Sequence, residues 1–154
     1  MQEIRRKDRI MDYEDSIKLL ANGEYGILSM VTLENTGYGV PLNYIFEDNK
    51  IYIHCAVEGR KLESFINNPN VSFCVVGKTQ VQADKFSTIY ESVIAFGKIS
   101  ESEDIEKREA LIKILAKYSP EHMENGIKYI DAAFNKVKIF RIDVTDITAK
   151  AKMK

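Results

Sequence analysis

The chain has 154 residues, of which 45% are hydrophobic and 29% charged, and its formal net charge is −1 at pH 7. This length suits one domain with a single hydrophobic core, so we expect one domain over residues 1–154. Balanced charge and short apolar runs argue against a nucleic-acid-binding surface and a membrane span, and the charged N-terminus lacks the apolar core of a secretion signal, so we expect a cytoplasmic protein.

Short strands joined by turns make up most of the predicted elements, and helices are inserted between them. Asp12 can cap the first helix, Ser102 can cap a later one, and Pro120 separates that later helix from the next. In chain order, the sequence predicts a helix from Asp12 to Gly23, strands over 25–32, 40–47 and 50–56, a helix over 60–68, a strand over 71–77, a loop over 79–90, a strand over 91–100, two helices before and after Pro120, and a strand over 137–145. This order favours an antiparallel α+β barrel over alternating βαβ units.

The apolar pattern within these elements indicates which side chains enter the core. In the third strand, which follows the two-residue turn Asp48-Asn49 and so predicts a hairpin, Ile51 and Ile53 alternate with Tyr52 and His54. The basic tail AKAKMK is expected to be frayed and solvated. The helix after the third strand has an apolar face made of Leu62, Phe65 and Ile66.

Cysteine and histidine give little sign of a metal site. Cys55 and Cys74 each lie in an apolar strand without C-x-x-C spacing, so we expect free buried thiols and no metal. His122 follows Pro120 in a polar patch, where we expect it at the surface without a role.

The segment HCAVEGRKLESFINNP, residues 54–69, carries the most informative pattern. A strand ends, Gly59 follows, and Arg60 and Lys61 open a short helix. Cations are unfavourable at a helix N-terminus because the dipole and the free N–H groups there are already positive, and a bound anion would remove the conflict. Gly59 would let a phosphate approach the backbone closely, and both side chains could hold it. The residues alone leave a second interpretation open, in which Arg60 and Lys61 are merely solvated.

Arg60-Lys61, Phe65 and Asn68-Pro69 resemble the signature R-K-x-x-x-L-x-x-N-P of the pyridoxamine-phosphate-oxidase-like family, whose two basic residues hold the phosphate of FMN. The chain is also similar to the nitroimidazole-resistance branch of that family over nearly its whole length, residues 3–150. The segments that carry this similarity are GEYGILSM (23–30), VPLNYIFED (40–48), YIHCAVEGRK (52–61), FSTIYESVIAFGK (86–98) and AKYSP (116–120).

The resemblance implies a split β-barrel of six or seven antiparallel strands with peripheral helices, which forms a homodimer and binds FMN in clefts at the dimer interface. From the residues alone, Asn43 and Tyr44 would be only a polar break in a strand. The cofactor-binding residues that the resemblance implies are Pro41, Leu42, Asn43, Tyr44, His54, Cys55, Ala56, Gly59, Arg60 and Lys61 from one subunit, with Tyr90 and Ser92 approaching from the other.

Two positions bear on the reaction. His54 matches a cleft-lining histidine of the nitroimidazole-resistance branch, which implies a proton donor or hydrogen-bond partner for a substrate beside the flavin, although a histidine in an apolar strand is more often a core residue. True pyridoxamine phosphate oxidases carry R-Q-x-R-x-x-G where this chain has residues 91–97, so that Ser92 replaces the glutamine and Ile94 the second arginine. The lost cation makes pyridoxamine phosphate a doubtful substrate.

We therefore expect an FMN-dependent oxidoreductase that acts on a small reducible molecule, such as a nitro compound or a quinone-like acceptor. The chain has no G-x-G-x-x-G motif, so a nicotinamide would bind only transiently. Two alternatives stay open: a flavin-binding protein without turnover, and a haem-binding protein of the same fold with His54 as the ligand.

Overall fold

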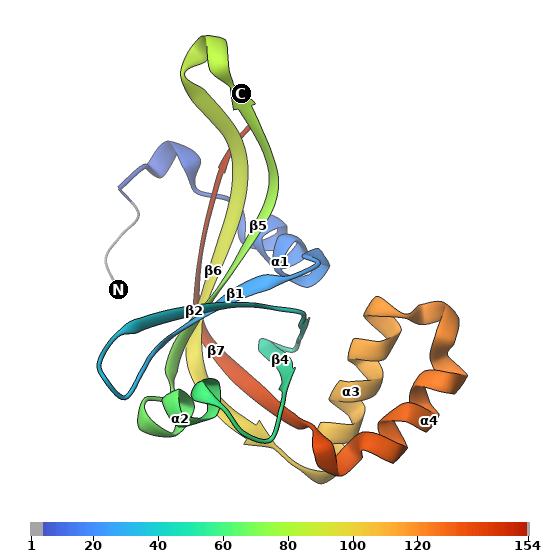
Figure 1. Ribbon diagram of the computed structural model, residues 1–154. Helices are drawn as coiled ribbons and strands as arrows, with labels where there is room; N and C mark the ends of the chain where they lie inside the picture. Colours follow the sequence, from blue (N-terminus) through green and yellow to red (C-terminus); the bar gives the residue numbers. More distant parts are fainter. Residues whose placement is uncertain (1–4, 154) are drawn as a thin grey trace.

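The computed structural model describes residues 5–153, which form a seven-stranded antiparallel sheet with α-helices around it (Figure 1). This confirms the antiparallel α+β prediction. The strands are β1 (Gly26–Val31), β2 (Gly37–Leu42), β3 (Ile45–Glu47), β4 (Lys50–Cys55), β5 (Asn70–Gln82), β6 (Ser87–Ser102) and β7 (Lys138–Lys152). The α-helices are α1 (Tyr13–Asn22), α2 (Arg60–Asn67), α3 (Asp104–Tyr118) and α4 (Met123–Ala133), and short 3-10 turns are η1 (Lys7–Arg9), η2 (Ala83–Lys85), η3 (Pro120–His122) and η4 (Phe134–Lys136).

The two edge strands of the sheet follow one another in the sequence, although they lie at opposite ends of the strand order. Hydrogen-bonded neighbours follow the order β2-β1-β5-β6-β7-β4-β3, so β2 and β3 are the edge strands. Only Asn43 and Tyr44 lie between them in the chain. We call these two residues the junction, because they join one edge of the sheet to the other.

Two apolar clusters, separated by β4, stabilise the fold. Ile51 and Ile53 face the larger cluster and Tyr52 faces the smaller one, so the alternation predicted for this strand is confirmed. The smaller cluster lies where α3 and α4 pack on β4 and β7, and includes Leu111, Ile130 and Ile139. The larger cluster is made by the sheet, α1 and α2, and its fully buried members include Leu20, Leu28, Phe73, Val75 and Val93.

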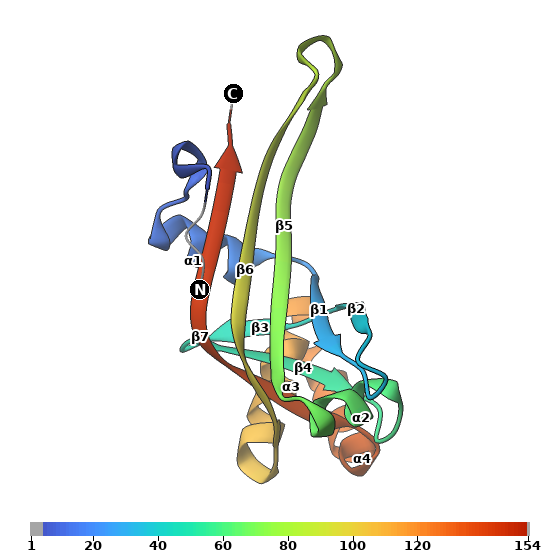
Figure 2. The same ribbon diagram turned by 90° about the vertical axis from the view of Figure 1, so that its left-hand side faces the viewer.

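β5 and β6 extend well beyond the other strands as a long hairpin, which we call the β5–β6 arm (Figures 1 and 2). The sequence predicted a loop over 79–90, but Thr79 to Gln82 pair with Ser87 to Tyr90 and only η2 forms the turn, so this prediction is wrong. The usual strand pattern is weak here because the arm is exposed. Val81 is 75% exposed and Phe86, at the tip, is 98% exposed.

Three further predictions need correction. The strand predicted over 40–47 is two strands, β2 and β3, on opposite edges of the sheet. The tail is not frayed as far as Lys152, because β7 reaches that residue and pairs it with Tyr90; Lys154 lies outside the described residues. Ser102 ends β6, and Glu103 takes the N-cap position of α3.

The apolar face of α2 is narrower than predicted. Leu62 and Phe65 pack against the larger cluster, whereas Ile66 is 85% exposed. None of the helices within residues 5–153 has the length and apolar character needed to cross a membrane.

Candidate functional site

The N-terminus of α2 has the features of an anion-binding site. Gly59 precedes the helix with φ 130°, a conformation that favours glycine, and a Cβ added there would meet no atom within 4 Å. Within the described part of the chain, no side chain caps the first turn of α2. The exposed guanidinium of Arg60 lies 5.5 Å from the ring centroid of Tyr38, and Lys61 is half-buried. Uncapped N–H groups and two adjacent cations together provide donors and charge for a phosphate.

Lys61 also lies close enough to the end of β4 to affect the side chains there. Although part of the His54 side chain is exposed, partial burial of the imidazole, and then the charge of Lys61, lower the pKa of His54, so this imidazole is neutral near pH 7. A neutral imidazole can donate a hydrogen bond from one ring nitrogen and accept one at the other. Burial raises the pKa of Cys55 despite Lys61, so its thiol stays protonated and is no activated nucleophile.

The structure brings four of the predicted residues, Asn43, His54, Cys55 and Ala56, to one cavity of about 740 Å³. We call it the α3–α4 cavity, because its other walls come from α3, η3, α4, η4 and Val137. The side chains of Asn43, His54 and Ala56 are exposed, whereas Cys55 is buried in the larger cluster. The end of β4 therefore has a surface that a small molecule can reach.

Tyr118, near the end of α3, bonds to the backbone at the junction. Its hydroxyl accepts a hydrogen bond from the backbone N–H of Tyr44 at 2.9 Å. The same hydroxyl lies 2.9 Å from the carbonyl oxygen of Tyr44 and 2.7 Å from that of Glu24, to either of which it can donate. The main chain leaves one edge strand here and has not yet entered the other, so a side chain takes the place of a neighbouring strand.

Lys117 adds a second connection between α3 and the junction. Its ammonium donates to the carbonyl oxygens of Ala21 at 3.2 Å, Gly23 at 2.8 Å and Tyr44 at 3.1 Å. It also lies 4.2 Å from the centroid of the Tyr44 ring. Burial lowers the pKa of Lys117. Lys117 thus ties α3 to the C-terminal end of α1 and to the junction through carbonyl groups.

The two junction residues differ in what they can offer a ligand. Tyr44 is fully buried: its hydroxyl donates to the carbonyl of Leu20 and its ring packs edge-on against Phe73 at a centroid distance of 4.7 Å. Tyr44 can therefore reach a ligand only through its backbone. Asn43 is exposed, as is Pro41 in the adjoining strand, whereas Leu42 between them is half-buried.

Ser92 and Pro41 lie on the same face of the sheet. Pro41 pairs with Ile27, Ile27 with Cys74, and Cys74 with Ile94, and directly paired residues of antiparallel strands share a face. Ser92 precedes Ile94 by two residues and so lies on this face as well. Ile27 is 39% exposed, and Cys74, Ile94 and Ser92 are half-buried. Tyr90 also lies in β6, near the arm, and is half-buried.

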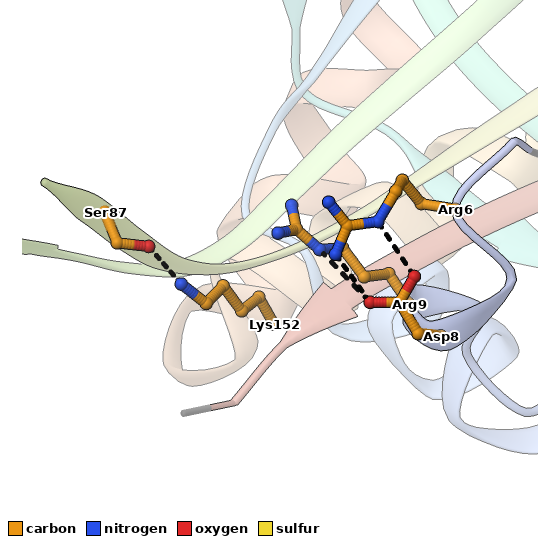
Figure 3. A network of polar contacts seen from close by, with 5 residues as sticks. All are labelled: Arg6, Asp8, Arg9, Ser87 and Lys152. Carbon is orange, nitrogen blue, oxygen red and sulfur yellow. Dashed lines mark hydrogen bonds and ion pairs between the residues drawn. The ribbon is translucent and has the colours of Figure 1, made fainter. Parts of the chain in front are cut away.

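A cavity of about 830 Å³ lies elsewhere, between η1, α1 and the ends of β6 and β7. Arg6 donates from Nε to Asp8 Oδ1 at 2.8 Å and Arg9 lies 3.9 Å from the same carboxylate, while Lys152 bonds to Ser87 (Figure 3). The bond from Arg6 lowers the pKa of Asp8 to about 2. Four basic and four acidic side chains line this cavity: Arg6, Arg9, Lys18, Lys152, Asp8, Asp12, Asp15 and Glu91. Since its charges balance and none of the predicted residues is among its described lining, we place the candidate site at α2 and the α3–α4 cavity.

Comparison with known proteins identifies the family. The profile of the family described as “Pyridoxamine 5'-phosphate oxidase” matches residues 12–151. The chain belongs to this family. No curated protein matches it by sequence.

This member of the pyridoxamine 5'-phosphate oxidase family is also similar to several solved structures. A candidate 5-nitroimidazole antibiotic resistance protein from Bacteroides thetaiotaomicron is 28% identical with a TM-score of 0.79, covering 92% of this chain and 85% of that one. An FAD-binding protein from Mesorhizobium loti is 23% identical with a TM-score of 0.66, covering 94% and 97%. An FAD- and heme-binding protein from Mycobacterium smegmatis is 14% identical with a TM-score of 0.81, covering 93% and 72%, so that it shares the fold. The predicted family and the likeness to nitroimidazole-resistance proteins are confirmed.

The helices α3 and α4 contribute residues to the site whose roles could not be predicted from the sequence. The segment AKYSP contributed to the resemblance, but nothing indicated that Lys117 and Tyr118 would bond to the junction. His122 is exposed, as predicted, yet it also lines the α3–α4 cavity. The one available signal was Pro120, which turns the chain so that α4 folds back beside α3.

Proposed function

We propose that this protein is a cytoplasmic FMN-dependent oxidoreductase that acts on a small reducible molecule as a split-barrel homodimer. The observation that carries the proposal is the uncapped start of α2, where Gly59, Arg60 and Lys61 follow a strand that presents His54 to a cavity. In a member of this family, such an arrangement fits the phosphate of FMN better than it fits two solvated cations.

Bound FMN would supply the hydride or electron transfer, and the residues of this chain would position it. Arg60, Lys61 and the first N–H groups of α2 would hold the phosphate. Pro41 and the exposed amide of Asn43 would lie along the ring system, to which Tyr44 could add only backbone groups. Lys117 and Tyr118 would act as positioning residues, because they fix the backbone on which Asn43 is carried.

His54 would face the substrate. Its imidazole is neutral near pH 7, so it could donate a hydrogen bond to a nitro or carbonyl oxygen, or accept one at its other ring nitrogen. Ile94 stands where true pyridoxamine phosphate oxidases have an arginine, so a pyridoxal phosphate group would lack that cation. A substrate without a phosphate fits better.

A second copy of the chain would cover the sheet face that carries Ile27, Cys74, Ile94 and Ser92. This face is partly apolar and exposed, and it holds Pro41 from one part of the predicted flavin site and Ser92 from the other. A two-fold dimer through it would bring Ser92 of each subunit toward the flavin of the other. Replacing Ile94 with Asp should therefore give a monomer in sedimentation velocity and weaken FMN binding. A variant that stays dimeric and keeps its FMN affinity would refute this arrangement.

Absorption spectra of the purified protein, before and after addition of FMN, test the proposal most directly. A retained flavin band, and turnover of a nitroaromatic compound with reduced nicotinamide, would support the oxidoreductase. A flavin band without turnover of any acceptor in a panel of nitroaromatics and quinones would support a flavin carrier instead. A Soret band with no flavin affinity would refute the FMN proposal in favour of haem.

A further inference from the structure

The α3–α4 cavity has large apolar walls that the protein itself does not fill. Leu111, Ile114 and Leu115 of α3 and Ile130 of α4 line it. Ile114 and Leu115 remain half-buried although they belong to the edge of the smaller cluster. At about 740 Å³ the cavity is within the range of roughly 300–1,000 Å³ that is usual for small-molecule sites. An apolar ligand would complete the burial of these side chains.

The ionisable groups of the cavity are unevenly distributed by sign. His54, His122 and Lys136 line it, whereas its described lining contains no Asp or Glu. The whole chain has 22 Lys and Arg against 23 Asp and Glu, so this bias is local rather than compositional. Of the three, Lys136 supplies an ammonium group, whereas the other two supply imidazole rings. His122 precedes α4 and Lys136 follows it, so they come from opposite ends of a helix of 11 residues, which is about 16 Å long.

We propose that the α3–α4 cavity binds an aromatic anion of two or three fused or linked rings, with its rings against α3 and α4 and its anionic group paired with Lys136. His54 and His122 would add hydrogen bonds from their imidazole rings. The binding itself needs no flavin, but the role of this cavity as the substrate compartment rests on the proposed function, because the predicted flavin-binding residues Asn43, His54, Cys55 and Ala56 also line the cavity.

Two fluorescent probes with the same ring skeleton test the proposal. Anilinonaphthalene sulfonate carries an anionic sulfonate group, and N-phenyl-1-naphthylamine is neutral. The native, flavin-free protein should bind the sulfonate more tightly than the neutral probe in fluorescence titrations. Lys136→Gln should weaken the sulfonate about two- to fivefold, the range for a partly exposed charge pair, and leave the neutral probe unchanged. Ile114→Trp should fill the cavity and weaken both probes by tenfold or more.

Lys128→Gln is the matched control, because Lys128 is an exposed lysine on α4 whose partner is Glu124 and which lies outside the cavity lining. It should change neither affinity. Equal affinities of the native protein for the two probes, or equal effects of Lys136→Gln and Lys128→Gln on sulfonate binding, would overturn the anion preference. Equilibrium dialysis should show that saturating FMN leaves sulfonate binding in place, and competitive displacement by FMN would overturn a separate compartment. If FMN fails to bind while the probes behave as stated, the proposed function fails and the cavity assignment stands.

Discussion

Replacing both Arg60 and Lys61 with alanine should weaken FMN binding on the order of a hundredfold and leave riboflavin binding nearly unchanged. Riboflavin lacks only the phosphate, so the comparison isolates the contact with these two side chains. A hydrogen bond to a charged group is worth about 1.5–3 kcal/mol. Arg60 is exposed and already contacts the Tyr38 ring, so the lower value applies to it. With this lower value for Lys61 as well, the two contacts amount to at least about 3 kcal/mol, and each 1.4 kcal/mol is a factor of ten.

Flavin fluorescence quenching and equilibrium dialysis would measure both affinities on the same preparations. Some FMN affinity should remain, because the N–H groups of α2 are unchanged. The helix itself should persist, since removing two cations from its first turn relieves their repulsion with the dipole. Lys18→Ala with Lys128→Ala, which removes two exposed cations from other helices, is the matched control. Equal losses for FMN and riboflavin, or no loss for either, would mean that Arg60 and Lys61 are solvated cations without a ligand.

Three other predictions concern stability and can be checked by urea unfolding. Lys117→Met should lower the free energy of unfolding by about 2 kcal/mol. The carbonyl groups of Ala21 and Gly23 lose this donor, the carbonyl of Tyr44 keeps only Tyr118, and leaving a buried acceptor unpaired costs about 1–3 kcal/mol. A change under about 0.5 kcal/mol would rule out the tie to the junction. Burial lowers the pKa of His54 in the folded state from its ordinary value of 6.5, so the unfolded chain binds a proton at His54 before the folded chain does as the pH falls. The free energy of unfolding should therefore decrease as the pH drops below 6.5, and His54→Gln should flatten this dependence. An unchanged pH profile would contradict the assignment. Gly97→Ala should lower the free energy of unfolding by about 3 kcal/mol, because the new Cβ would lie 2.2 Å from the carbonyl oxygen of Asp143. Gly37→Ala, whose Cβ would have no atom within 4 Å, should lower it by less than about 1 kcal/mol. Similar losses for both variants would refute the packing argument.

Local sequence patterns were sufficient to predict most strands and helices, because their signals lie within a few residues. The alternation of Ile51 and Ile53 with Tyr52 and the proline after α2 are examples. The placement of β2 and β3 on opposite edges of the sheet could not be predicted, since Asn43 and Tyr44 indicate only a polar break within one strand. Its cause is tertiary: the chain must leave one edge of the sheet and enter the other, and Tyr118, far away in sequence, satisfies its backbone.

The candidate site was predictable to the extent that its residues are close in sequence. Gly59, Arg60 and Lys61 form one motif and lie together at α2, and His54 lies nearby on β4. The cavity wall was not predictable, because whether a helix such as α4 folds over a particular strand depends on packing between distant segments. The arm was missed for a related reason, since Val81 and Phe86 face solvent on a hairpin whose pairing comes from its partner strand rather than from a buried face.

The junction has a consequence for association between chains. An exposed edge strand offers unpaired N–H and C=O groups to which a strand of another molecule can add, and such addition leads to aggregation. Here β3 has only three residues, and Pro41, the second-to-last residue of β2, lacks an N–H group to donate. Where one edge passes into the other, Lys117 and Tyr118 already occupy the polar groups of Tyr44. The same side chains that hold Asn43 in place thus also occupy backbone groups to which a strand of another molecule could otherwise bind.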